Sequence, residues 1–290
     1  MAVNSVMNKK VRVSDNILLG LIYLSAFLAV GLLVGIICYV FYRGIGNLSL
    51  AFLVTEQSPT KGIMGIAGNI VNTLYIVILT LIVVTPIGVG GAIYLNEYAK
   101  PGRLVSTIEF TIEVLTGIPS IIFGLFGSVF FGQTLGLGYS MLTGSFTLTI
   151  MVLPLIAKNT QEALRTVPQS YRSGALGIGA TKWYMIRTIV LPSSLEGIIT
   201  GCILAVGRIV GESAALLFTA GVGTIIAKNV FAAFSRSGGT LSVALYMYVS
   251  ERGEFDVGYA IAAILLVLVL ALNGATRLVR NRMKKKEGAQ

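Results

Sequence analysis

The 290-residue sequence contains no histidine and only two cysteines. The absence of histidine excludes His-metal catalysis and the common Ser-His and Cys-His nucleophiles. The sequence also lacks a Gly-x-x-x-x-Gly-Lys-Ser/Thr loop, so the chain is not an ATPase of the usual phosphate-loop type. Cys38 and Cys202 fall inside apolar runs without metal-ligand spacing, and we expect small buried hydrophobic residues rather than a disulfide. We therefore expect no metal and no cofactor.

Charge is also scarce, because only 12% of the residues are Asp, Glu, Lys or Arg while 55% are apolar. A soluble domain of this composition would have too few polar groups to cover its surface. Uncharged runs of about 20 residues are long enough to cross a bilayer as helices. The sequence therefore predicts an all-α, polytopic membrane protein.

Six membrane-spanning helices are expected from these runs. They are Ile17–Tyr42, about Ile70–Leu95, two spans between Glu113 and Lys158 joined by a glycine-rich turn near Gly132–Gly138, about Gly197–Ala220, and Val257–Thr276. Pro86 and the following glycines Gly88, Gly90 and Gly91 predict a bend or a close helix contact in the second span.

The distribution of basic residues predicts the orientation. With six spans both termini share one side, which collects sixteen of the 22 Lys and Arg residues, including the tail "RLVRNRMKKKEG". Both termini are therefore expected in the cytoplasm, and the tail is read as an anchor for membrane lipid rather than a nucleic-acid site. The expected organisation is an N-terminal segment with the first span (1–65), a membrane domain (66–280) containing a cytoplasmic region (158–196), and a basic tail (281–290).

The cytoplasmic region 158–196 is the longest connection on that side, and it predicts two short helical pieces divided near Val167 and Pro168. Gly179 allows a sharp turn, Thr181 can cap the next helix, and Pro192 is expected to end it. Two apolar faces are expected at helical spacing: Tyr171, Ala175 and Ile178 on the second piece, and Trp183, Ile186 and Val190 on the helix that follows Gly179. The pattern alone fits either helices lying flat on the membrane or a surface for a cytoplasmic partner.

The spacing in this region resembles the signature of ABC importer permeases, Glu-Ala-Ala, three residues, Gly, nine residues, Ile-x-Leu-Pro. Ser173 stands in place of the Glu and Gly174 in place of the first Ala, so we expect an apolar, steric contact rather than an ionic one. The resemblance implies that a separate ATPase docks here. The residues assigned to this coupling are Tyr171, Ser173, Gly174, Ala175, Gly179, Trp183, Ile189, Leu191 and Pro192.

Longer stretches resemble the PstA-type membrane subunit of phosphate importers over roughly residues 65 to 280. They are "NTLYIVILTLIVVTPIGVGGAIYLNEYA", "GIPSIIFGLFG", "EALRTVPQSYRSGALGIGATKWYMIRTIVLP" and "GRIVGESAALLFTAG". The resemblance implies a type I importer permease in the bacterial inner membrane, not itself an enzyme. Its implied partners are a PstC-type permease, an ATPase dimer and an extracytoplasmic phosphate-binding protein. A PstC-type identity, or another oxyanion such as sulfate or molybdate, is the alternative.

Two charges lie inside the fifth predicted span, Arg208 and Glu212. Charges at the centre of a span cost about 2.5 to 3.5 kcal/mol each, so they require a partner or a polar cavity. At positions i and i+4 they can form an ion pair that fixes helix packing. Alternatively, Arg208 faces a substrate path, where its planar fork suits phosphate oxygens and Glu212 holds it. Gly207 and Gly211 favour a close helix contact beside them.

Three further expectations concern the spans. Ala215 stands where the family usually has proline, so we expect the fifth span to lack a proline kink. Glu109 and Glu113 precede the third span, which favours a place at the membrane interface over a place in the path. An intramembrane enzyme would need catalytic groups on facing spans, and apart from Arg208 and Glu212 the spans offer almost none.

Overall fold

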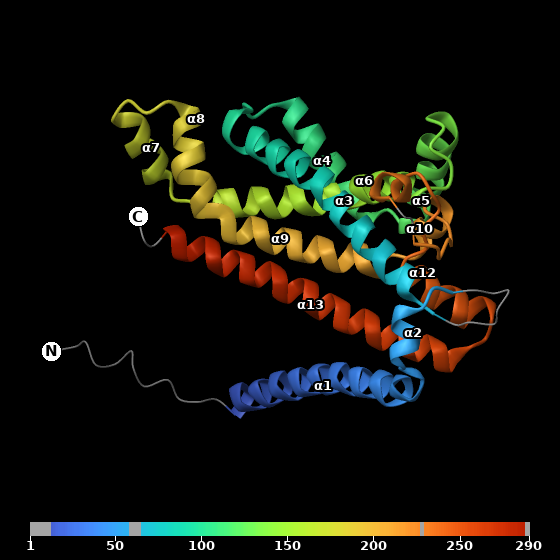
Figure 1. The fold of residues 1–290 in the computed structure, drawn as a ribbon. Helices are drawn as coiled ribbons and strands as arrows, with labels where there is room; N and C mark the ends of the chain where they lie inside the picture. Colours follow the sequence, from blue (N-terminus) through green and yellow to red (C-terminus); the bar gives the residue numbers. More distant parts are fainter. Residues whose placement is uncertain (1–12, 58–64, 227–228, 288–290) are drawn as a thin grey trace.

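The computed structural model describes residues 13–57, 65–226 and 229–287, and all regular structure in these ranges is helical (Figure 1). Five of the basic residues used to predict the orientation lie outside the described residues: Lys9, Lys10, Arg12, Lys61 and Lys228. Tail residues 288–290 also lie outside them. The α-helices are α1 (Val13–Gly44), α2 (Leu50–Val54), α3 (Ala67–Ile93), α4 (Arg103–Gly117), α5 (Ser120–Gly127), α6 (Met141–Arg165), α7 (Gln169–Gly177), α8 (Lys182–Met185), α9 (Leu191–Gly211), α10 (Ala214–Thr219), α11 (Val230–Phe234), α12 (Leu241–Tyr246) and α13 (Phe255–Glu287). Short 3₁₀ or π segments are η1 (Ile45–Asn47), η3 (Tyr94–Tyr98), η4 (Ser128–Thr134), η5 (Ile186–Val190) and η6 (Met247–Glu251).

The predicted spans are present in the described residues. Five helices are long and apolar enough to cross a membrane, and a sixth crossing is possible where two helices form one bent pair. The beginning of α1 and the end of α13 lie on the same side of the molecule as α7 and α8, on the left in Figure 1. An even number of crossings with both ends on one side agrees with the predicted six-span arrangement.

The core is formed mainly by α3, α6 and α9. α6 is the most buried of the candidate spans and packs against both α3 and α9, while α13 runs between α9 and α1 (Figure 1). Gly88 of α3 confirms the predicted close contact, because an added Cβ would lie 2.8 Å from Ile156 Cγ2 on α6. Small residues let helices approach closely where the lipid offers no hydrophobic driving force. Cys202 is half-buried but Cys38 is exposed on α1, so the expectation of two buried thiols was wrong for Cys38.

Two predicted spans are interrupted. The third is a bent pair, in which α4 and the helix Ser120–Thr134 meet at 104°. Pro119 adjoins this bend, and proline disfavours helical geometry in the residue before it. The glycine-rich turn after this pair is confirmed, with Gly136 and Gly138 at φ of 70° and 59°. The fifth span does not run to Ala220, because its helix ends at Gly211 and α10 begins at Ala214.

At the end of the bundle opposite α7, the start of α3 is held by buried amides. Asn69 Nδ2 donates to the carbonyl of Gly239 at 2.9 Å, and Asn72 Nδ2 donates to the carbonyls of Gly223 at 3.1 Å and Gly239 at 3.3 Å. Thr73 Oγ1 accepts a hydrogen bond from the Leu241 backbone N–H at 3.0 Å. These bonds satisfy polar groups that would otherwise be costly to bury. They attach the connection between α10 and α12 to the first turns of α3.

The Gly68→Ala variant should destabilise the subunit, because an added Cβ would lie 1.8 Å from the backbone oxygen of Thr224. Overpacking of this kind costs about 1–3 kcal/mol. Gly90→Ala on the same helix is the matched control, since its Cβ would meet no atom within 4 Å. Thermal unfolding of the two purified variants in detergent should therefore show a lower midpoint for Gly68→Ala only. Equal midpoints would contradict the described packing of α3 against this connection.

Candidate functional site

The predicted cytoplasmic region forms a helical hairpin, here called the α7–α8 hairpin (residues 169–185). α6 continues to Arg165 and α7 starts after Pro168, so the predicted division at this point is confirmed. Gly179 has a φ of 88°, which favours glycine, and it provides the predicted turn. Thr181 Oγ1 accepts the Tyr184 N–H at 3.3 Å and caps α8 as predicted. Because both flanking helices extend into the region, the connection is shorter than the expected loop of residues 158–196.

Pro192 does not end the helix that Thr181 caps, contrary to the prediction. α8, η5 and α9 form one continuous helix from Lys182 to Gly211. The π segment Ile186–Val190 directly precedes Leu191 and Pro192. Proline lacks a backbone N–H, and a local π-bulge shifts the hydrogen-bonding register so that the helix can continue. Ile189, Leu191 and Pro192 are half-buried along this helix rather than exposed on the hairpin.

In each of the two predicted apolar faces, some side chains are buried and others are exposed. Ala175 is 5% exposed and packs in a cluster with Met185, Ile186 and Val190, whereas Ile178 is 88% exposed. Ile178 follows the last residue of α7, so helical spacing no longer relates it to Ala175. Tyr171 and Trp183 are also exposed. The larger set of exposed apolar side chains on the hairpin is Tyr171, Leu176, Ile178, Trp183 and Tyr184.

The residues that replace the signature's first two positions are exposed. Gly174 has open space at its Cβ position, and Ser173 Oγ donates to the backbone carbonyls of Gln169 at 3.1 Å and Ser170 at 3.2 Å. The Ser173 hydroxyl is thus satisfied within its own helix. The apolar, steric contact expected at these positions stays a prediction.

Arg208 and Glu212 do not form the predicted ion pair within the described residues. Arg208 lies exposed in the last turn of α9, and Glu212 lies beyond the end of that helix with extended backbone. Helical i, i+4 spacing therefore no longer applies to the two residues. Glu212 Oε1 instead accepts the Ala215 N–H of α10 at 3.1 Å. This cap stabilises a helix break at 212–213, so the fifth span is interrupted there although it contains no proline at this point.

Arg208 has no hydrogen-bond or ion-pair partner in the described part of the chain. An added Cβ at Gly207 or Gly211 would meet nothing within 4 Å, so the predicted close helix contact is not made inside this subunit. The end of α9 therefore presents an unpaired guanidinium and two glycines on an open surface. Such a planar guanidinium can donate two parallel hydrogen bonds to the oxygens of an anionic ligand.

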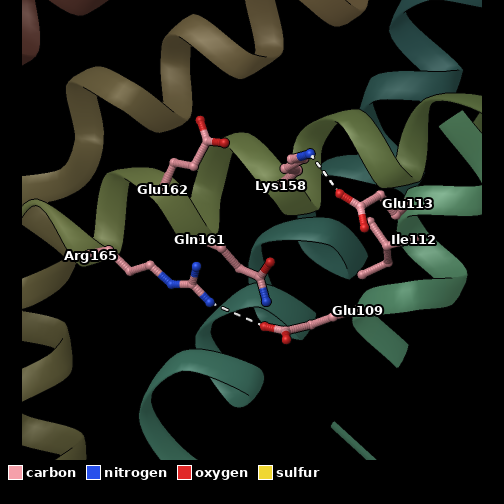
Figure 2. Close-up of a pocket in the computed structure, with 7 residues that line it drawn as sticks. All are labelled: Glu109, Ile112, Glu113, Lys158, Gln161, Glu162 and Arg165. Atoms are coloured by element: carbon pink, nitrogen blue, oxygen red, sulfur yellow. Dashed lines mark hydrogen bonds and ion pairs between the residues drawn. The ribbon is translucent and has the colours of Figure 1, made fainter. Parts of the chain in front are cut away.

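Glu109 and Glu113 face α6 across a cavity of about 210 Å³ (Figure 2). Glu109 pairs with Arg165 at 3.1 Å, and Glu113 pairs with Lys158 at 3.7 Å. Both carboxylates belong to α4, and both bases belong to α6. These exposed pairs give each of the two carboxylates a charged partner on α6.

Pattern reasoning missed one further contact, between Glu97 at the end of η3 and Arg172 on α7. The guanidinium of Arg172 binds the Glu97 carboxylate with an Nη2 to Oε1 distance of 3.0 Å. The residues are separated by 75 positions in the sequence. The available signals were a carboxylate at the end of the second span and an arginine directly before Ser173.

The fold is shared with known transport proteins. Residues 85–285 match the family described as binding-protein-dependent transport system inner membrane component. The chain belongs to this family. It is accordingly a multi-pass permease subunit of an ABC importer in the inner membrane, and it is not itself catalytic.

Similar proteins cover nearly the whole permease. The probable ABC transporter permease protein YqgI of Bacillus subtilis is 35% identical over 97% of this chain and 99% of its own length. The phosphate transport system permease protein PstA of Pasteurella multocida is 32% identical over 90% of this chain and 92% of its own length. The PstA protein of Haemophilus influenzae is 32% identical over 91% of this chain and 93% of its own length.

Solved structures show the same fold. A chain of a bacterial alginate ABC transporter in complex with a substrate-bound periplasmic protein matches 94% of the permease and 96% of its own length, with a TM-score of 0.69 and 15% identity. A chain of the inward-facing MetNI methionine transporter matches 76% of the permease and 94% of its own length, with a TM-score of 0.56 and 19% identity. The six-span importer permease fold expected from the sequence is thereby confirmed.

Proposed function

We propose that this chain is the PstA-type permease subunit of an importer that moves inorganic phosphate across the bacterial cytoplasmic membrane. The observation that carries the proposal is the similarity to curated PstA proteins along most of the chain, at 32% identity over 90% of its length. The quoted motifs are distributed over the second to fifth spans rather than confined to the coupling signature. The resemblance therefore includes the helices that would line the path.

Arg208 is the proposed path residue. It lies in the last turn of α9, is exposed and has no partner in the described residues, so its guanidinium is free to bind an oxyanion. Charge-assisted hydrogen bonds from a planar fork suit phosphate oxygens. Glu212 belongs beside this site through the cap that it provides to α10, at 3.1 Å from the Ala215 nitrogen. Its proposed task is to fix the helix break next to Arg208 rather than to neutralise the arginine.

The α7–α8 hairpin is the proposed docking surface for an ATPase subunit dimer. Ser173 and Gly174 present little side-chain bulk, and Ile178 and Trp183 present exposed apolar groups. A short helix with such a surface fits the groove of a partner protein.

A second permease of the PstC type and an extracytoplasmic phosphate-binding protein complete the proposed complex. The open glycines at the end of α9 are the proposed approach of the second permease.

Substrate identity is tested by transport in reconstituted vesicles. The complex purified with this chain should accumulate labelled phosphate when ATP is supplied on the ATPase side, and a large excess of sulfate or molybdate should leave that uptake unchanged. One arginine does not by itself distinguish oxyanions, so the competition is the deciding measurement. Uptake of sulfate or molybdate instead of phosphate would contradict the substrate. A complex containing two copies of this chain, or this chain beside a PstA protein, would contradict the PstA-type assignment.

A further inference from the structure

One guanidinium joins three elements at the α7 end of the bundle. Arg172 of α7 donates from Nε and Nη2 to the Glu97 carboxylate, from Nη2 to the Leu164 carbonyl at 2.8 Å, and from Nη1 to the Val167 carbonyl. Glu97 belongs to η3, which continues α3, and Leu164 lies in the last turn of α6. The contact therefore ties the hairpin to the ends of two spans at once.

This contact is buried, in contrast to the other ion pairs of the described residues. The side chains of Arg172 and Glu97 are 11% and 5% exposed. The Glu97 carboxylate also accepts from Asn96 Nδ2 at 2.8 Å. A buried pair with its hydrogen bonds satisfied is held in one geometry, and removal of either partner leaves an uncompensated charge. The exposed pairs of Glu109 and Glu113 impose no comparable constraint, since solvent competes for them.

α3 connects this contact with the opposite end of the molecule. α3 and η3 form one helical span from Ala67 to Tyr98, with Glu97 in its last turn. The first turns of the same helix hold the carbonyls of Gly223 and Gly239 through Asn69 and Asn72. α7 is therefore linked through α3 to the connection between α10 and α12.

We propose that Arg172 and Glu97 are positioning residues that transmit movement of the α7–α8 hairpin to α3, and through Asn69 and Asn72 to the opposite end of the path. This inference rests on the proposed function, because it assigns the hairpin's movement to a docked ATPase. The packed side chains around Ala175 hold the hairpin in place. The Arg172–Glu97 contact makes α3 follow when the hairpin moves.

The test compares transport with ATP hydrolysis in the same vesicles. Glu97→Gln and Arg172→Lys should each lower the amount of substrate imported per ATP hydrolysed by roughly fivefold or more, the lower end of measured coupling effects. Lysine keeps the charge beside Glu97 but lacks the planar fork that reaches two carbonyls as well. Glu109→Gln is the matched control, since it removes a carboxylate from an exposed pair at the same end and should leave the ratio unchanged.

Each outcome decides the inference. A variant of Glu97 or Arg172 that assembles with the ATPase and keeps the wild-type ratio overturns it. Failure of both variants to assemble, while Glu109→Gln assembles, shows a purely structural contact and overturns it equally. The wild-type vesicles test the proposed function separately. If they import another oxyanion, the ratio is measured with that ion and the inference is still decided.

Discussion

Replacing Ile178 by glutamate should detach the ATPase from the permease and leave the permease itself folded. Ile178 is 88% exposed directly after α7, so the change removes no packing inside the subunit. In a complex, the new carboxylate would be buried in an apolar contact without a partner, which is unfavourable by at least about 1–3 kcal/mol. Copurification on a tagged permease should show about a tenfold or larger loss of ATPase per permease, the equivalent of about 1.4 kcal/mol.

The control places the same substitution at the other end of the molecule. Ile225 is 70% exposed on the connection between α10 and α11, so Ile225→Glu should retain the ATPase at the wild-type ratio. Charged substitutions of Ala175 or Gly179 would be poorer tests, because Ala175 is buried and Gly179 requires a positive φ. Normal ATPase recovery with Ile178→Glu would show that the hairpin is not the docking surface.

The positions of the spans could be predicted because they depend on local composition. The expected second span, Ile70–Leu95, corresponds to α3, and the expected sixth, Val257–Thr276, lies inside α13. A bilayer requires every backbone group of a lipid-facing segment to bond within its own helix, so a long apolar run specifies a helix almost without reference to the remainder of the chain. The same reasoning gave the Gly179 turn and the Thr181 cap, which depend on neighbouring residues only.

The interruptions could not be predicted by the same reasoning because they depend on competing interactions. Proline often marks the end of a helix, but the π segment before Pro192 keeps this helix continuous. Glu212 was read as a helical partner for Arg208, but its carboxylate stabilises α10 and so ends the preceding helix. In both places the outcome is decided by a small difference between two local hydrogen-bonding arrangements, which hydropathy does not describe.

The candidate site was predicted in its location and only partly in its contacts. The hairpin and the charged positions of the fifth span were identified, but the faces of α7 and α8 depend on packing against α3, α6 and η5. The Glu97–Arg172 contact joins residues far apart in the sequence, and no periodicity connects them. Such tertiary pairs require the three-dimensional arrangement of the helices.

Replacing Arg208 by glutamine should abolish most phosphate import while the complex still assembles. Arg208 has no partner within the described residues, so its loss breaks no ion pair in the subunit and should leave stability nearly unchanged. A bound phosphate would lose hydrogen bonds to a charged group, which contribute about 1.5–3 kcal/mol. Uptake by reconstituted vesicles should therefore fall roughly 10- to 150-fold, as that range of energies implies.

The matched control lies on the same continuous helix. Arg187 is exposed near the other end of the segment Lys182–Gly211, so Arg187→Gln makes the same change of charge away from the proposed path. It should keep uptake near the wild-type rate, provided that ATPase copurification confirms an intact complex. Uptake with Arg208→Lys should lie between the rates of Arg208→Gln and Arg187→Gln, because an ammonium keeps the charge but loses the bidentate geometry. Equal uptake by Arg208→Gln and the wild type would show that Arg208 is not part of the substrate path.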